Sequence, residues 1–163
     1  MLSLKAGAAA AILAFAVCGV VAGNAAAMDA DAFLWAGRGG GGGDYESGVK
    51  AARAGDWHMS LHYLKRSVRR DPQDADALTV LALSYRKLGR MQESMRFFEA
   101  ALAVDPDHRS ANLHAGDAYL AGGNLVKAME IQARLTDLCP KGCKELEALK
   151  SAIEAFGRKG PDS

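Results

Sequence analysis

The sequence predicts an all-α fold, a solenoid of three stacked helical hairpins followed by one closing helix. Three observations lead to this prediction. Pro72, Pro106 and Pro140 stand 34 residues apart, and a fixed period in the thirties indicates a stack of helical hairpins. Within each copy of the period, apolar residues recur at helical spacing. A glycine separates the two apolar segments of every copy, where a turn between helices favours a positive φ.

Aligning the chain on these prolines brings residues of one kind into columns. The glycine column consists of Gly55, Gly89 and Gly123. A column of small residues, which lets two helices approach closely, consists of Gly48, Ala82 and Gly116. A third column holds Leu64 and Phe98 and is broken by Gln132 in the last copy. The columns therefore predict hairpin turns, close helix crossings and core positions.

The apolar stripes predict two helices in each hairpin and one helix after them. Trp57, Leu61, Leu64 and Val68 step by four, three and four residues, which is typical of an amphipathic helix. Proline ends the second helix of each copy because it lacks an amide donor and disfavours helix for the residue before it. The predicted helices cover residues 45–54, 57–70, 74–88, 91–104, 108–121, 124–138 and 143–156. We expect the last one to cap the third hairpin with Leu149, Ile153 and Phe156.

The columns resemble the tetratricopeptide repeat family over about residues 41–140. Together with the N-terminal residues described below, they suggest an exported bacterial member of that family. The second copy fits best, with Leu78, Leu81, Ala82, Tyr85, Ser94, Phe98, Ala101 and Pro106. The third copy keeps Gly116, Tyr119, Ala128 and Pro140 but has Asn112 where the family favours tryptophan. The first copy is degenerate and keeps Gly48, Leu64 and Pro72.

The resemblance implies a protein-interaction module in which the first helix of each hairpin lines a concave groove for extended peptides. The matching groove positions are Tyr45, Val49, Arg53, Thr79, Leu83, Arg86, Lys87, Leu113, Asp117 and Leu120. This set has an apolar floor and one basic side, so an apolar peptide with some acidic character suits it. It lacks the Lys and Asn set by which some family members clamp a C-terminal carboxylate.

The ends of the chain differ in composition from the repeats. Residues 1–27 combine Lys5, an apolar run and the small residues Ala25 to Ala27, which predicts a secretory signal peptide cut after Ala27. An uncleaved membrane anchor is the alternative. Lipid attachment at Cys18 is not expected, because Val17 precedes it where such a site needs a small residue. We therefore expect export, to a bacterial periplasm first and to the medium second. The other predicted units are a glycine-rich N-terminal segment at 28–43, the repeats at 44–140, the capping helix at 141–157 and a disordered tail at 158–163.

The segment between the signal peptide and the repeats ends in a glycine run. Glycine loses much entropy on ordering, so residues 37–43 are predicted to be a flexible tether. The apolar triplet Phe33-Leu34-Trp35 lies just before these residues, in the same segment. It is either part of a disordered tail or a segment that docks, for example in the protein's own groove.

The charge balance excludes a global attraction for nucleic acid or anionic lipid. The chain has 20 Lys+Arg and 19 Asp+Glu. Cleavage after residue 27 removes one lysine and no acid, which leaves 19 of each and a neutral mature chain. The local basic run Lys65, Arg66, Arg69 and Arg70 is interpreted as a solvated helix end. No stable membrane insertion is expected after cleavage.

Two cysteines remain after cleavage, Cys139 and Cys143, in the sequence Cys-Pro-Lys-Gly-Cys. An even cysteine count in an oxidising compartment predicts a disulfide, here between the third hairpin and the closing helix. Redox chemistry is the alternative, because Cys143 begins a helix that would lower its pKa. Redox-active pairs usually have two intervening residues, however, and this pair has three.

No catalytic motif or cofactor site is evident, and we expect a non-enzymatic protein. His58 and His62 share a helix face at i, i+4 and could hold a metal, but no third ligand is evident. Three functions remain open: an interaction scaffold of the cell envelope, a periplasmic redox or metal-handling accessory using the cysteine or histidine pair, and a self-associating structural module.

Overall fold

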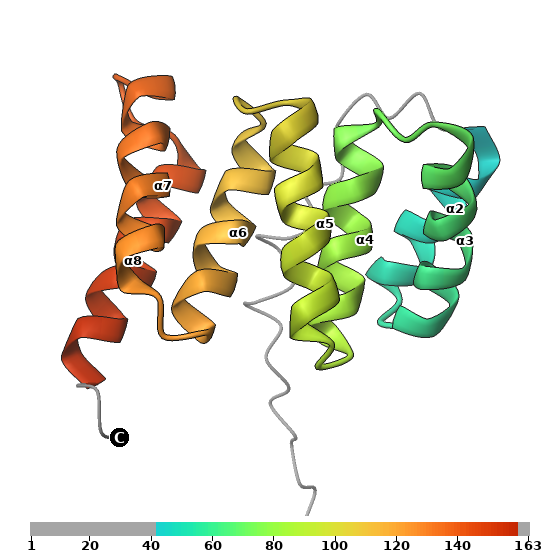
Figure 1. Cartoon of the computed structure of the whole chain (residues 1–163), viewed down its shortest axis with the longest axis horizontal. Helices are drawn as coiled ribbons and strands as arrows, with labels where there is room; N and C mark the ends of the chain where they lie inside the picture. Colours follow the sequence, from blue (N-terminus) through green and yellow to red (C-terminus); the bar gives the residue numbers. More distant parts are fainter. Residues whose placement is uncertain (1–41, 160–163) are drawn as a thin grey trace, which may run out of the picture.

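The structure is a computed structural model that describes residues 42–159, and it confirms the all-α solenoid. Within this range it contains seven helices (Figure 1). Each begins and ends no more than three residues from its predicted bounds. The helices are α2 (Gly42–Arg53), α3 (Trp57–Arg70), α4 (Ala75–Lys87), α5 (Met91–Val104), α6 (Arg109–Ala121), α7 (Leu125–Leu138) and α8 (Lys144–Lys159).

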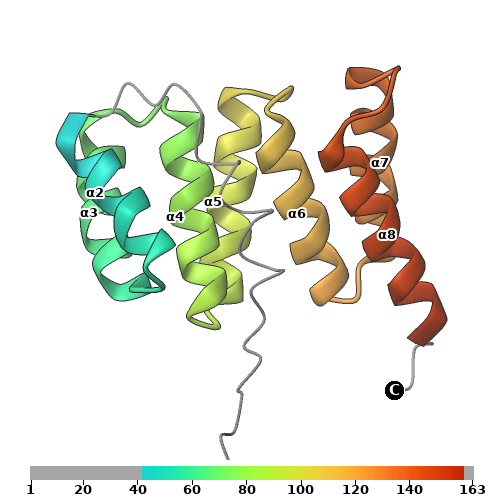
Figure 2. The same cartoon turned by 180° about the vertical axis from the view of Figure 1, so that it is seen from behind.

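The helices form two layers. Each hairpin pairs two consecutive helices, α2 with α3, α4 with α5 and α6 with α7. The first helices contact one another along one layer, which faces the viewer in Figure 2, and α8 extends this layer by packing on α6 and α7. The second helices α3, α5 and α7 form the other layer. The first helices all run in the same direction, because the chain reverses once within each hairpin and once between hairpins.

The glycine column forms the hairpin turns, as predicted. Gly55, Gly89 and Gly123 have φ of 76°, 73° and 77°. An L side chain rarely adopts this backbone conformation, so the turns need glycine there. The three turns are therefore alike in geometry, which keeps the hairpins in one repeating arrangement.

Close helix crossings explain the column of small residues. A Cβ atom on Gly48 would lie 2.6 Å from Cγ of Leu64, and a Cβ atom on Gly116 would lie 2.7 Å from Cδ1 of Leu149. Both leucines are fully buried. The first crossing lies within the first hairpin, and the second joins the third hairpin to α8. The predicted close approach is thus confirmed at both positions.

The closing helix covers the third hairpin. Leu146 and Leu149 of α8 are buried in the main apolar cluster, and Ile153 and Phe156 pack against it. Gln132, which breaks the column of Leu64 and Phe98, is only partly buried, whereas those two side chains are fully buried. In the third hairpin, α8 supplies the apolar cover from outside the repeat.

The predicted signal peptide, the apolar triplet at 33–35 and the C-terminal residues 160–163 lie outside the described residues. The first helix begins at Gly42, two residues before the expected start of the repeats at residue 44. Ser47 Oγ donates a hydrogen bond to the carbonyl oxygen of Gly43 within this helix. Among the described residues, no helix is both long enough and apolar enough to cross a membrane.

Candidate functional site

The predicted groove positions all lie on α2, α4 and α6, the first helices of the three hairpins. Their apolar members are buried in the main core cluster rather than exposed as a floor. Their exposed fractions lie between 5% and 8%, for Tyr45, Val49, Leu83, Leu113 and Leu120. Thr79 is also buried, and its hydroxyl donates to the carbonyl of Ala75.

The accessible members of the set are charged. Arg53 and Lys87 are exposed, and Arg86 and Asp117 are partly exposed. Arg86 and Asp117 form an ion pair of 3.8 Å that joins α4 to α6. Arg53, Arg86 and Lys87 all lie in the last turn of their helices. Because the first helices run in one direction, these cations lie along one edge of the layer.

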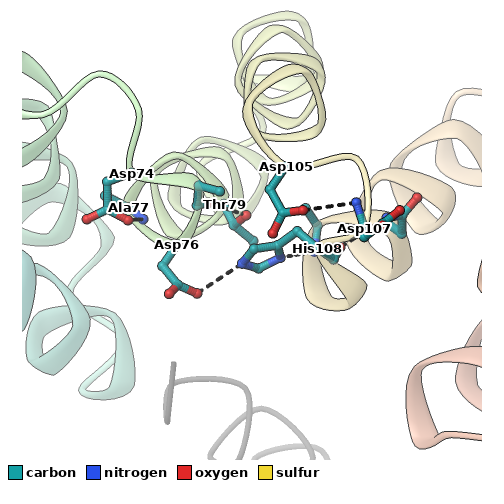
Figure 3. A network of polar contacts seen from close by, with 10 residues as sticks. Asp74, Asp76, Ala77, Thr79, Asp105, Asp107 and His108 are labelled. Atoms are coloured by element: carbon teal, nitrogen blue, oxygen red, sulfur yellow. Dashed lines mark hydrogen bonds and ion pairs between the residues drawn. The ribbon is translucent and has the colours of Figure 1, made fainter. Parts of the chain in front are cut away.

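The opposite edge carries carboxylates, which is a feature that the sequence reasoning missed (Figure 3). Asp74 caps the start of α4 by accepting from the amide of Ala77 at 2.9 Å, and Asp76 lies in the first turn. Asp76 Oδ1 lies 3.0 Å from Nε2 of His108, the residue that caps α6. The sequence signal was available, because helix starts favour acidic residues and the starts of α4 and α6 share an edge.

His108 links two first helices through both ring nitrogens. Nε2 donates to Asp76, and Nδ1 accepts from the backbone amide of Ala111 at 3.1 Å. The neutral ring with its proton on Nε2 satisfies both bonds. A protonated ring would lose the bond from Ala111, because both of its nitrogens are then donors.

The negative charges of these carboxylates help to raise the pKa values of three neighbouring groups. Burial opposes a charge on His108, but the hydrogen bond from its ring to Asp76 and the negative charges of Asp76 and Asp105 raise its pKa. Burial, together with the charges of Asp76 and Asp71, raises the pKa of Asp74. Burial and the charges of Asp76 and Asp74 raise the pKa of Tyr45 above its usual range. This edge therefore has a negative potential.

The cysteine pair lies where the third hairpin joins α8. The two sulfur atoms lie at disulfide-bonding distance, with Cα atoms 5.7 Å apart. Cys139 follows α7 and is 6% exposed, while the carbonyl of Cys143 accepts the amide of Glu147 at the start of α8. The pair thus links the last hairpin to its cap.

The two histidines on α3 lie in a cationic setting that disfavours a metal. His58 and His62 line a surface pocket together with Arg66, Arg69 and Arg90, among other side chains. Positive neighbours repel a metal cation. Across residues 42–159 there is no group of three His, Cys, Asp or Glu residues that could hold a metal ion. The metal-handling alternative has no ligand set in this part of the chain.

The interpretation of the basic run as a solvated helix end needs a correction. Arg66 and Arg70 both reach Asp44 on α2, at 3.4 Å and 2.6 Å, and Asp44 is largely buried. These contacts tie the first helix to the second. Sequence reasoning missed them because Asp44 lies more than twenty residues from either arginine, outside any helical spacing.

Comparison with protein families agrees with this architecture. Two family models described as tetratricopeptide repeat match residues 45–101 and 85–153. Together they cover the span from residue 45 to residue 153, which is most of the chain. The chain therefore belongs to the tetratricopeptide repeat family, and the matched region includes α8 up to residue 153.

One curated protein matches half of this chain, and solved structures match more of it at lower sequence identity. The human protein IFIT1 homolog B is 30% identical over 82 residues, which are 50% of this chain and 17% of that protein. The chain thus spans about a sixth of that relative. The Yersinia enterocolitica type III secretion chaperone SycD, in complex with a peptide of the translocator YopD, is 18% identical with a TM-score of 0.64, covering 71% of this chain and 91% of that one.

A second solved structure gives the same result. The second TPR domain of human RPAP3, in complex with the HSP70 peptide SGPTIEEVD, is 21% identical with a TM-score of 0.62. The match covers 68% of this chain and 92% of that chain. At these identities the likeness shows the fold.

Proposed function

We propose that the chain is a non-enzymatic interaction scaffold that binds a partner peptide or protein along the layer of first helices. The observation that carries this proposal is the placement of all ten predicted groove positions on α2, α4 and α6, which form one layer. The similar structures with bound HSP70 and YopD peptides support it by fold alone.

The layer has two charged edges that a partner would have to match. Arg53, Arg86 and Lys87 form the basic edge, and Asp74 and Asp76 lie at the acidic one. The apolar positions between them are largely buried, so the accessible charges set the specificity. Asp117 neutralises part of the charge of Arg86. The partner that fits best places acidic residues along the basic edge and runs across the first helices.

We further propose that this scaffold works in the bacterial cell envelope. The support is the composition of residues 1–27, which is typical of a cleaved export signal. The check is the N-terminal sequence of the protein recovered from the periplasm. We expect it to begin at Met28. A chain that retains residue 1 would contradict cleavage, and a chain that remains in the cytoplasm would contradict export.

The interaction proposal is tested by reversing charge on the basic edge. The combined variant Arg53→Glu, Arg86→Glu, Lys87→Glu should lose partners that the wild-type chain captures from a periplasmic extract, because like charges then face an acidic partner. Charge reversal is preferable to a change at Leu83, whose burial means that a charged substitution there would unfold the helix.

A matched control reverses charge on the other layer. Arg96 and Arg134 are exposed on α5 and α7, and Arg96→Glu with Arg134→Glu should leave capture unchanged. Circular dichroism of both variants should match the wild type. Partners that remain bound to the first variant, or that leave both variants equally, would show that the first-helix layer is not the binding surface.

A further inference from the structure

A surface pocket with a strongly cationic lining lies between α3 and the start of α5. It has a volume of about 360 Å³. In the part of the chain that the structure describes, its lining consists of His58, Leu61, His62, Lys65, Arg66, Arg69 and Arg90. Four of these side chains are permanent cations and two are imidazoles. Its lining comes from α3 and from Arg90, and none of the ten predicted groove positions belongs to it.

The carboxylates near the pocket do not balance its charge. Asp44 lies 3.4 Å from Arg66 but also binds Arg70 at 2.6 Å, and Glu93 accepts from Nε of Arg90 at 2.8 Å. Within residues 42–159, Lys65 and Arg69 form no ion pair with a carboxylate. The pocket therefore retains an excess of positive charge although the chain as a whole is close to neutral.

The cations on α3 are placed at a cost to the helix. Lys65 and Arg69 are four residues apart, and Arg66 and Arg69 are three apart, so these cations are neighbours on the helix surface. Like charges at these spacings destabilise a helix. An anion bound among them would remove this repulsion.

Arg90 also departs from what its position favours. The other helices with a described cap start at Asp56, Asp74, His108 and Asn124, whose side chains accept a backbone amide. Arg90 occupies the same position before α5 and makes no such bond. A cation at a helix start opposes the helix dipole. The guanidinium of Arg90 instead pairs with Glu93, so this helix start has a cation at the pocket in place of a cap.

One aromatic ring holds two of the pocket cations in place. The Nζ atom of Lys65 lies 5.4 Å from the ring centre of Tyr85, and the guanidinium carbon of Arg90 lies 4.8 Å from it. The ring itself is buried and stacks on Phe97 with centroids 5.3 Å apart. The face of an aromatic ring attracts cations. The positive charges of α3 and α5 are thus fixed next to each other before any ligand arrives.

We propose that this pocket binds a compact phosphate-bearing anion with at least two negative charges. Arginine guanidinium groups match the oxygen geometry of phosphate and bond it in pairs. Among the described residues the lining contains one apolar side chain, Leu61, and no Phe, Tyr or Trp, so its cations favour recognition of the phosphate group over an apolar body. The volume of the pocket leaves ample room for two linked phosphates.

The probe is inorganic pyrophosphate, titrated into the full-length chain by calorimetry at about 0.15 M salt, where long-range attraction is screened. We expect saturable binding at one site. Arg69→Ser should weaken binding about tenfold or more, because a hydrogen bond to a charged group contributes at least that factor. Arg134→Ser, an exposed arginine on α7, should leave the affinity unchanged.

A second variant separates binding from folding. Arg90→Ser removes a pocket cation and creates the Ser-x-x-Glu capping box with Glu93, three residues into α5. We expect its melting temperature to stay the same or rise while pyrophosphate binding weakens about tenfold or more. Unchanged affinity in both Arg69→Ser and Arg90→Ser, or an equal loss in Arg134→Ser, would overturn the proposal.

Two further titrations identify the source of the phosphate. Phosphatidylcholine vesicles that contain phosphatidic acid test a lipid headgroup, and pyrophosphate tests a free anion. Binding to the vesicles that Arg69→Ser abolishes would assign the pocket to a membrane lipid, and binding to pyrophosphate alone would assign it to a soluble ligand. Poly-glutamate that binds as tightly as pyrophosphate would overturn the phosphate specificity.

Discussion

At the scale of single residues, His108 shows how one side chain serves two helices. Its ring caps α6 through Nδ1 and contacts Asp76 of α4 through Nε2. Protonation exchanges the cap for a stronger ion pair, and the negative charges of Asp76 and Asp105 favour the protonated ring. The contact between α4 and α6 therefore depends on pH.

The sign of this dependence follows from the raised pKa of His108. A group whose pKa is higher in the folded state stabilises the fold below its unfolded pKa, about 6.5, and loses this effect as pH rises through the folded value. In His108→Asn, which keeps a capping side chain, the loss of unfolding free energy should be largest near pH 5–6 and shrink toward pH 9. Denaturant titrations across this range measure it.

The pairing with Asp76 supplies the control for that experiment. Asp76→Asn should flatten the same pH profile, because the asparagine has no charge to favour the imidazolium. The double variant should lose little more than either single variant, since both remove one interaction. A difference in unfolding free energy between the wild type and His108→Asn that stays constant from pH 5 to pH 9 would contradict this account.

Gly48 gives a second residue-scale prediction. Gly48→Ala should lower the free energy of unfolding by about 1–2 kcal/mol, because its Cβ atom would overlap the buried side chain of Leu64. Gly43 lies in the same helix with no atom near its Cβ position. Gly43→Ala is the matched control and should raise stability by about 0.5 kcal/mol. Equal effects of the two substitutions in thermal unfolding would rule out a crossing that requires glycine.

At the scale of helices and turns, the repeat period in the sequence predicted where the helices and the turns between them lie. The positions of helices, turn glycines and close crossings repeat with the prolines, and repetition makes weak local signals strong. What the sequence did not reveal lies between copies and depends on three-dimensional neighbours. The contact between Asp76 of α4 and Nε2 of His108, at 3.0 Å, is an example because it joins the second copy to the third.

The predicted groove positions fall on the first helices α2, α4 and α6, but the exposure of their side chains could not be predicted. Family position identifies the face of a helix and not the depth at which each side chain lies. The acidic and basic edges of the first-helix layer also follow from the positions of residues along the helices. They arise because helix starts favour acids and helix ends favour bases, and because the first helices are parallel.

The cysteine pair gives a prediction at the scale of the link between α7 and α8. We expect mass spectrometry of the exported chain to find Cys139 and Cys143 oxidised and unaffected by mild reductant. Cys139→Ser with Cys143→Ser should lower the free energy of unfolding by about 2 kcal/mol, since the loop is short. A bond that mild reductant opens readily would favour the redox alternative instead.

At the scale of the whole molecule, stability spreads from hairpin to hairpin through nearest-neighbour contacts. The end of such a stack needs cover, and α8 supplies it with Leu146 and Leu149. The pocket and the charged edges of the first-helix layer share no side chain, although Lys87 of the basic edge lies 5.7 Å from the ring of Trp57, which precedes His58 of the pocket. The two proposed ligands would therefore bind through different side chains.

Removing the cap tests this view of the stack. A chain that ends at Cys143 should lose about 4 kcal/mol or more of unfolding free energy, because Leu146 and Leu149 no longer bury apolar surface. Its uncovered third hairpin should associate with other copies, which light scattering detects. A truncated chain that remains monomeric and melts at the wild-type temperature would show that α8 is dispensable.

The contact between Gly116 and Leu149 also limits how this protein can evolve in length. Tandem duplication of the first or second copy would insert a unit whose Leu64 or Phe98 fills its own core. Duplication of the third copy would place Gln132 at that position and leave Gly116 facing a helix that brings no leucine to it. New copies can thus enter the gene ahead of the third repeat, while the third repeat and α8 have to be inherited together as one terminal unit.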